Sequence, residues 1–360
     1  MKLYDLSDYE PNTGKRFLRQ GCMHGDKTLQ TIIDNLKINL HSPFRSEIFG
    51  NSINTRDIDE NGRQIAKSAI GISCHCLVIP AEDPWKLLDV LEKEHERKVK
   101  NDFGKKGRIH VGFYDECNFH NLEFLNVIDE VHKKYPWMMS VLVGLNYNIL
   151  QEPFPVMDAA AQNPEYTVLP DLEAKCKILK ENGKVCGRST PYTARLVNTK
   201  KIKGYDGKKV DLVDKFGNEL KGIFTFEPVF TEIIVPEEKD KRKTEEYKQR
   251  CYTNICPMHF EIPYKQDAER IELFIKTSIL EGVSSDPVDF LHLESIREKF
   301  EQVDYLDQIL RYLTEKKGVS YVEENFYLDY KKNGTSKKIY MPELREQLLS
   351  DVEKELLTKI

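Results

Sequence analysis

The segment Gly21-Cys22-Met23-His24-Gly25-Asp26-Lys27-Thr28 constrains the fold of this chain more than any other stretch. A short apolar run, Phe17-Leu18, precedes it, and apolar residues at helical spacing follow from 29 to 40. A loop between a strand and a helix can point backbone N–H groups at phosphate oxygens, with Lys on the β/γ-phosphates and Thr on Mg²⁺. The usual pattern is G-x-x-x-x-G-K-[ST], and Asp26 stands at its second glycine. The match is therefore incomplete and needs a second feature.

An acidic pair supplies that second feature. Residues 108–114 form an apolar run that predicts a buried strand, and Asp115 and Glu116 follow it directly. Two carboxylates at the carboxyl end of a parallel strand lie where open α/β sheets bind ligands. One can hold Mg²⁺ and the other can accept a proton. A solvated Asp-Glu turn is the alternative for the pair taken alone, but loop and pair together favour a nucleotide-binding site.

Length and composition restrict the class of protein. At 360 residues the chain is long enough for two or three domains, and 40% hydrophobic with 31% charged residues is ordinary for a soluble globular protein. The net charge of −5 argues against nucleic acid as a partner. No apolar run approaches the roughly twenty residues of a membrane span, and residues 1–14 do not resemble a signal peptide. We therefore expect no membrane association, a cytoplasmic location, and no disulfide framework among the eight cysteines.

Short apolar runs alternate with helical patterns between residues 15 and 167. The strands are expected at 16–20, 70–79, 108–114 and 139–145, and the helices at 27–40, 84–99 and 121–134. This alternation predicts an α/β fold, a P-loop NTPase-like parallel sheet with helices on both faces. The remaining ranges are expected to form an N-terminal extension (1–14), a small zinc-bound β subdomain (168–262) and a mainly helical C-terminal domain of unknown role (263–360).

Three cysteines and a histidine in the β-rich part predict a metal site. Cys256 and His259 have C-x2-H spacing, and Cys176 and Cys186 lie upstream. Four such ligands in two pairs fit a closed, tetrahedral structural zinc site. The C-x9-C spacing is wider than usual and suggests a knuckle lengthened around Asn182-Gly183. The alternative is three unrelated buried thiols and a surface histidine.

Seven short motifs follow one another between residues 15 and 262. They are Gly21–Thr28; Ile53–Arg56 with Glu60-Asn61-Gly62; Asp115–Phe119; Gly144–Asn148 with Glu152–Phe154; Cys186-Gly187; Thr193–Leu196; and Tyr252–Cys256. In order and wording they resemble the motifs G-P-M-F-S-G-K-T, I-D-x-R with H-[DN]-G, D-E-x-Q-F, G-L-D-x-x-F-x-x-x-P-F, C-G, T-x-R-L and Y-x3-C. These belong to the zinc-containing (type II) thymidine kinase family, of which the chain looks like a divergent member with insertions. The last hundred or so residues have no recognised counterpart.

The resemblance implies an ATP-dependent deoxynucleoside kinase of nucleotide salvage, with thymidine the family substrate. It also implies ATP, Mg²⁺ and a structural Zn²⁺, and a homo-oligomer that is a tetramer in the family. A lasso-like loop hung from the zinc knuckle would cover the base. The implied roles are phosphate binding by Gly21, Gly25, Lys27 and Thr28; Mg²⁺ binding by Thr28 and Asp115; general base, Glu116; phosphoryl stabilisation, Arg56; nucleoside binding by Met23, Phe119, Leu145, Phe154, Thr193, Thr231, Ile233 and Tyr252; and zinc binding by Cys176, Cys186, Cys256 and His259.

Some residues depart from the family pattern. Asp26 would repel phosphate unless it turns to solvent or towards Mg²⁺, and Ile149 replaces an aromatic residue that encloses the nucleoside. Asn54, Asn118 and Asn146 replace Asp, Gln and Asp. Two other functions therefore stay open. One is a catalytically weak nucleotide-binding regulator or scaffold that acts through the C-terminal domain. The other is a P-loop ATPase acting on nucleic acid, which the acidic balance disfavours.

Overall fold

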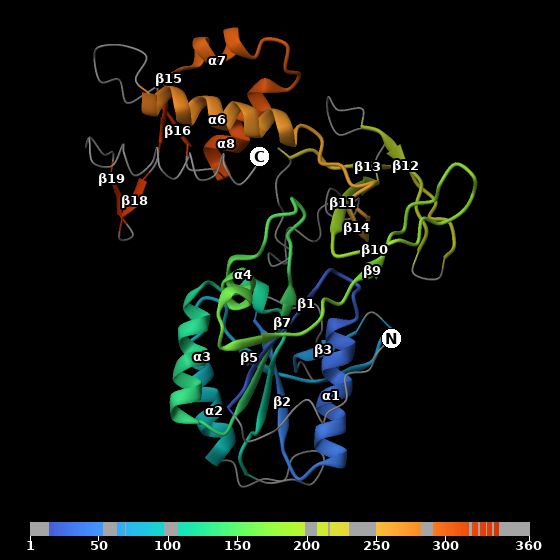
Figure 1. Cartoon of the computed structure of the whole chain (residues 1–360), viewed down its shortest axis with the longest axis vertical. Coiled ribbons are helices and arrows are strands. Elements are labelled where there is room, and N and C mark those ends of the chain that lie inside the picture. Colours follow the sequence, from blue (N-terminus) through green and yellow to red (C-terminus); the bar gives the residue numbers. More distant parts are fainter. Residues whose placement is uncertain are drawn as a thin grey trace. The chain divides into compact units, whose positions relative to one another are not determined.

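The computed structural model divides the chain into two compact units (Figure 1). The first comprises Met1–Phe226 and Ile234–Glu261, and the second Glu227–Ile233 and Ile262–Ile360. The residues described are 14–52, 63–68, 70–96, 107–198, 207–214, 217–229, 250–281, 291–316, 319–322, 325–328, 330–332 and 335–337. Among them, no helix combines the length and the apolar character needed to cross a lipid bilayer.

A six-stranded parallel sheet forms the centre of the first unit, in the order β5-β2-β6-β7-β1-β8. Its strands are β1 (Arg16–Gly21), β2 (Ser46–Asn51), β5 (Leu77–Ile79), β6 (Val111–Tyr114), β7 (Met139–Leu145) and β8 (Tyr166–Val168). The central strands are buried on both faces, as parallel strands usually are. The predicted mixed α/β architecture is confirmed.

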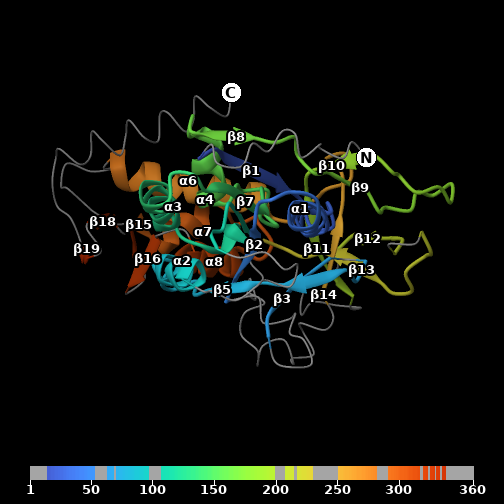
Figure 2. The same ribbon diagram turned by 90° about the horizontal axis from the view of Figure 1, so that it is seen from below.

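Helices cover both faces of this sheet (Figure 1; Figure 2). They are α1 (Lys27–His41), α2 (Lys86–Glu96), α3 (Glu123–Lys134) and α4 (Pro155–Gln162). On one face, α1 packs Ile32 and Ile38 against Ile48 and Val141. On the other face, the apolar sides of α2, α3 and α4 form a second core. The amphipathic spacing seen in the sequence thus gives two apolar layers that fix the sheet from both sides.

The structure contains elements that were not expected from the sequence. Strands β2, β3 (Ile65–Lys67) and β8 and helix α4 were not predicted, and the single strand expected over 70–79 is divided into β4 (Ser73–His75), which pairs with β3, and β5. Strand β2 has a polar start because Ser46 is buried against α1, where its hydroxyl lies 2.7 Å from Oδ1 of Asn35. When buried polar residues of a strand are hydrogen-bonded to a helix, the strand lacks the apolar run by which a strand is recognised in a sequence.

The described residues within 174–226 and 250–254 form a small antiparallel β subdomain of the first unit. Its main sheet has the order β12-β13-β11-β14. The strands are β11 (Thr193–Asn198), β12 (Lys209–Val210), β13 (Phe224–Phe226) and β14 (Arg250–Asn254), and a separate pair joins β9 (Ala174–Lys175) to β10 (Ser189–Thr190). A small core that includes Leu196, Phe224 and Ile255 lies beneath it.

The second unit combines helices with strands. Its helices are α6 (Lys265–Glu281), α7 (Leu293–Lys299) and α8 (Leu306–Lys316); its strands are β15 (Leu291–His292), β16 (Val319–Val322), β17 (Asn325–Leu328), β18 (Tyr330–Lys332) and β19 (Thr335–Lys337). An antiparallel sheet β15-β17-β16 packs with α6 and α8. The described part of this unit therefore adds a small sheet to the helices that were expected there.

Candidate phosphate loop and metal centre

The loop between β1 and α1 has a backbone that only some residues tolerate. His24 and Asp26 both adopt left-handed conformations, with φ of 58° and 60°. Asp26 is the N-cap of α1, and its carbonyl accepts the first helical hydrogen bond from Gln30 N at 2.8 Å. The left-handed region explains why glycine is usual at this position, and aspartate is one of the side chains that enter it at low cost. Asp26 is exposed to solvent, which answers the concern that it would fill an anion site.

Two glycines of the loop are required by a close backbone approach. A Cβ atom on Gly21 would lie 2.3 Å from the carbonyl oxygen of Leu172, and one on Gly25 would lie 2.2 Å from the same oxygen. Leu172 N in turn donates to Gln20 O at 3.0 Å. The segment after β8 therefore supports the loop from behind, and no larger side chain fits at either glycine.

The Lys27 ammonium is buried within the loop. Its Nζ donates to the carbonyl oxygen of Cys22 at 2.6 Å. Burial lowers the pKa of Lys27, and nearby negative charges, chiefly that of Glu116, oppose this shift. A buried ammonium held by one loop carbonyl, with carboxylate charges nearby, lies where the loop could receive an anionic ligand.

The loop and the acidic pair meet directly. Thr28 Oγ1 donates a hydrogen bond to Asp115 Oδ2 at 3.1 Å, although β7 lies between β1 and β6 in the sheet. Asp115 directly follows β6 and is 7% exposed. A hydroxyl and a carboxylate oxygen at this separation are ligands of the kind that Mg²⁺ prefers. The sequence placed these two residues together, and they lie together.

The two carboxylates of the pair differ in environment. Burial raises the pKa of Asp115 to about 7, and the charge of Glu116 adds to the rise, while the Thr28 hydrogen bond opposes it. Glu116 is half-buried and adopts φ 60°, at the start of a 3-10 turn, η2 (Cys117–Phe119). A left-handed glutamate is an uncommon backbone state and marks a position where the surrounding structure imposes the conformation.

Four apolar residues that were predicted to contact a nucleoside are only half-buried: Met23, Phe119, Leu145 and Phe154. The rings of Phe119 and Phe154 are 6.4 Å apart in an edge-to-face arrangement. Leu145 ends β7 beside Gly21, and its N–H donates to Asn118 Oδ1 at 2.9 Å. Their partial exposure next to the loop differs from that of fully buried core residues.

Two further predicted contacts lie in the β subdomain. Thr193 Oγ1 accepts a hydrogen bond from Met23 N at 3.0 Å, and Tyr252 is half-buried on β14. Arg56, Thr231 and Ile233 lie outside the described residues, as do Asn54 and the rest of its motif.

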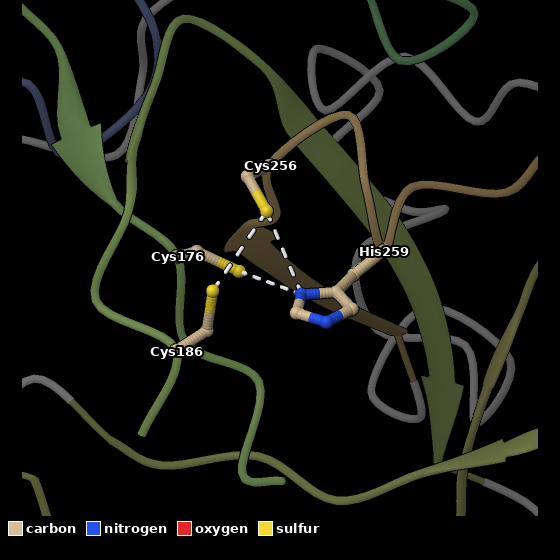
Figure 3. A group of neighbouring side chains, drawn as sticks. All are labelled: Cys176, Cys186, Cys256 and His259. Atoms are coloured by element: carbon tan, nitrogen blue, oxygen red, sulfur yellow. Dashed lines mark hydrogen bonds between the residues drawn. The ribbon is translucent and has the colours of Figure 1, made fainter. Parts of the chain in front are cut away.

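The four predicted metal ligands converge (Figure 3). Their ligand atoms all lie within 4.8 Å of one another. The Cys186 and Cys256 sulfurs are 3.8 Å apart, and His259 Nδ1 is 3.7 Å from the Cys176 sulfur and 3.5 Å from that of Cys256. A tetrahedral Zn²⁺ with bonds of about 2.3 Å to sulfur and 2.0–2.1 Å to nitrogen requires separations of about 3.8 and 3.6 Å. This Cys₃His group could therefore bind a metal ion such as zinc.

The wide C-x9-C spacing has a local explanation. Residues 176–187 form a hairpin in which Cys186 N donates to Ile178 O at 2.8 Å and Gly187 N to Cys176 O at 3.1 Å. Gly183, at φ 72°, turns the tip. The lengthened knuckle expected from the sequence is thus present, and the hairpin brings both cysteines to one end.

Three residues that contact the loop were not identified as loop contacts from the sequence. Besides Leu172, Thr190 O lies 3.3 Å from the Cys22 sulfur, and Asn254 Nδ2 donates to Met23 O at 2.8 Å. Asn254 pairs with Thr193 across β14 and β11. Contacts of this kind depend on strand register, for which a single sequence offers no signal.

The site therefore combines a loop with left-handed residues that packs against the Leu172 segment, a buried lysine, a hydroxyl–carboxylate pair and a metal centre in the same unit. No model of a known protein family matches the sequence, and no curated protein matches it as a relative.

Proposed function

We propose that this protein is an ATP-dependent deoxynucleoside kinase with a P-loop NTPase-like first unit, and that thymidine is its expected substrate. The hydrogen bond from Thr28 to Asp115 is the observation that carries the proposal. It joins a strand–loop–helix with a lysine to a strand that ends in two carboxylates, which is the arrangement that phosphoryl transfer needs.

The residues of the chain divide the chemistry between them. Lys27 and the N–H groups of the loop hold the phosphates of ATP, and Lys27 offsets their charge. Thr28 and Asp115 would hold Mg²⁺, which would neutralise charge on the phosphates when bound. Glu116, which lies next to Asp115 and is partly open to solvent, takes the proton of the sugar 5′-hydroxyl as this oxygen attacks the γ-phosphorus of ATP. The bond from the γ-phosphorus to the β-phosphate oxygen breaks, and ADP leaves.

The half-buried apolar residues around Met23 form the wall of the nucleoside pocket, with Thr193 and Tyr252 beside the base. Arg56, Thr231 and Ile233 keep the roles that the family resemblance gives them. The Cys₃His group holds a structural zinc, since all four positions are protein ligands and none is left open for a substrate. A homo-oligomer and a cytoplasmic location are parts of the same proposal.

The test is a panel of nucleosides with labelled ATP and Mg²⁺. We expect phosphorylation of at least one deoxynucleoside by the wild type. Glu116→Gln should lower kcat by about 10²–10⁴-fold with little change in MgATP affinity, because a general base contributes that much. Glu82→Gln changes an exposed carboxylate and is the matched control. No turnover with any common nucleoside would refute the kinase proposal.

A second candidate is a nucleotide-binding regulator or scaffold of low activity. Ile149, in place of an aromatic residue, favours it. It predicts MgATP binding, measured by calorimetry, without phosphorylation of any nucleoside.

A further inference from the structure

We propose that Asn254 and Thr193 act together as positioning residues that hold the phosphate loop in shape, and that they make its conformation depend on the metal centre. The nucleotide-binding consequence rests on the proposed function, whereas the conformational coupling stands on the contacts of the β subdomain alone.

The pair clamps one residue of the loop on both sides. Met23 N donates to Thr193 Oγ1 at 3.0 Å, and Met23 O accepts from Asn254 Nδ2 at 2.8 Å. Thr193 and Asn254 face each other in the β11–β14 ladder and are 4% and 1% exposed. Both polar groups of one peptide segment are therefore tied to a single cross-strand pair, in a buried setting where lost partners are not replaced by water.

The loop needs such support from outside. His24 and Asp26 flank Gly25 in left-handed conformations. Non-glycine residues in that region cost of the order of 1 kcal/mol each, and they persist only where neighbouring structure determines them. Met23, the residue before this strained stretch, is where the clamp acts.

The clamp and the metal ligands share the same short segments. Asn254 is two residues before Cys256, and Asn254 O accepts from Lys177 N at 2.9 Å, next to Cys176. Ile255 O accepts from Thr190 Oγ1 at 3.0 Å. A metal ion that binds Cys176 and Cys256 fixes both segments at once. Because no disulfide joins these cysteines, loss of the ion leaves the two segments linked by hydrogen bonds alone, and this loosens the end of β14 that carries Asn254.

The Met23 amide is the reporter of this coupling, because its N–H is donated to the clamp. Hydrogen exchange of the full chain would be followed in the zinc-loaded protein and after chelation of zinc. We expect chelation to speed exchange at Met23 at least tenfold while amides of β6 and β7 stay protected. Asn254→Asp, which sets an oxygen against Met23 O without a change in volume, should speed it about fivefold to tenfold with zinc still bound.

Matched controls come from the same sheet. Asn198→Asp places the same charge at the end of β11, where Oδ1 accepts a hydrogen bond from Ile223 N and can still do so. A second clamp variant, Thr193→Val, removes the buried hydroxyl that accepts from Met23 N. Its control is Thr225→Val, which removes a buried hydroxyl from β13. Thr193→Val should also expose the Met23 amide, so the proposal remains testable if Asn254→Asp does not fold.

If the metal acts through Asn254, the effects of chelation and of the substitution should not be additive. In Asn254→Asp, chelation should therefore raise the exchange rate of the Met23 amide by less than a further twofold. The inference fails if chelation leaves Met23 exchange unchanged in the wild type, or if both clamp variants behave like their controls.

Nucleotide binding is tested in a separate experiment. If the wild type binds MgATP, zinc removal should weaken MgATP binding, and MgATP should tighten the equilibrium binding of zinc by the same factor. A wild type that binds no MgATP would refute the proposed function and leave the exchange result to decide the coupling.

Discussion

Replacing Asp115 by asparagine should stabilise the protein in the absence of Mg²⁺, and more so at high pH. The carboxyl is buried beside Glu116, and its pKa is raised to about 7 from an ordinary value of 3.8. The folded state therefore holds a proton that the unfolded state has already lost between about pH 4 and pH 7. In this interval stability falls as pH rises, and the penalty is complete above pH 7.

The size of the effect follows from the shift. A difference of about three units at 1.36 kcal/mol per unit gives an upper limit of about 4 kcal/mol at pH 8. The amide keeps an oxygen for the Thr28 hydroxyl, so the hydrogen bond at 3.1 Å can survive. We expect Asp115→Asn to raise the free energy of unfolding by about 1–3 kcal/mol at pH 8 and by less than about 0.5 kcal/mol at pH 4.5.

Urea unfolding without added Mg²⁺, at several pH values, measures this. The two tryptophans of the chain, Trp85 and Trp137, both belong to the first unit, so their fluorescence reports on the unit that contains the site. Asp34→Asn is the contrasting control, because Asp34 is also buried but pairs with Arg19 at 2.5 Å. It should destabilise by about 3–5 kcal/mol, since it removes the carboxylate charge that faces the buried guanidinium of Arg19. Destabilisation by Asp115→Asn at pH 8, or an effect independent of pH, would refute the reasoning.

Three further predictions concern the loop and the metal. Asp26→Gly should stabilise the first unit by about 0.5–1 kcal/mol, because glycine enters the left-handed region freely; a lower urea midpoint would contradict this. Gly25→Ala should cost more than about 2 kcal/mol, because its Cβ would meet a backbone oxygen at 2.2 Å, whereas Gly183→Ala, which meets nothing, should cost only about 1 kcal/mol of backbone strain. Cys256→Ser should lose the one zinc ion expected per chain, which elemental analysis measures. It should also make the β subdomain sensitive to proteolysis, since structural zinc supplies folding energy. An unchanged zinc content would argue against the site.

The sequence predicted best what depends on residue type and short spacing. The strand–loop–helix and the acidic pair were placed together because parallel strands end at one edge of a sheet, and the Cys₃His group was found because few other patterns use those ligands. Strands without an apolar run were harder to predict. Strand β2 was missed since its buried serine is satisfied by asparagines of α1, which no local pattern reveals.

Contacts between segments far apart in the chain could not be predicted. The approach of Leu172 to both loop glycines and the hydrogen bond from Asn254 to Met23 O depend on how a later segment packs behind the loop. The conformation of Asp26 could not be predicted either. The sequence showed only that Asp26 stands where the pattern has glycine, and the structure shows that its side chain is exposed to solvent, which explains why the loop tolerates it.

The way the chain passes between its two units affects how it can be divided. Glu227–Ile233 belongs to the second unit but is flanked on both sides by the first. Val229 N donates to Pro263 O at 3.1 Å, so this short excursion is hydrogen-bonded to the start of the C-terminal segment. A truncation after Glu261 would strip that partner away while leaving the excursion behind. Expression of the first unit alone therefore calls for excising both pieces and bridging the gap with a linker.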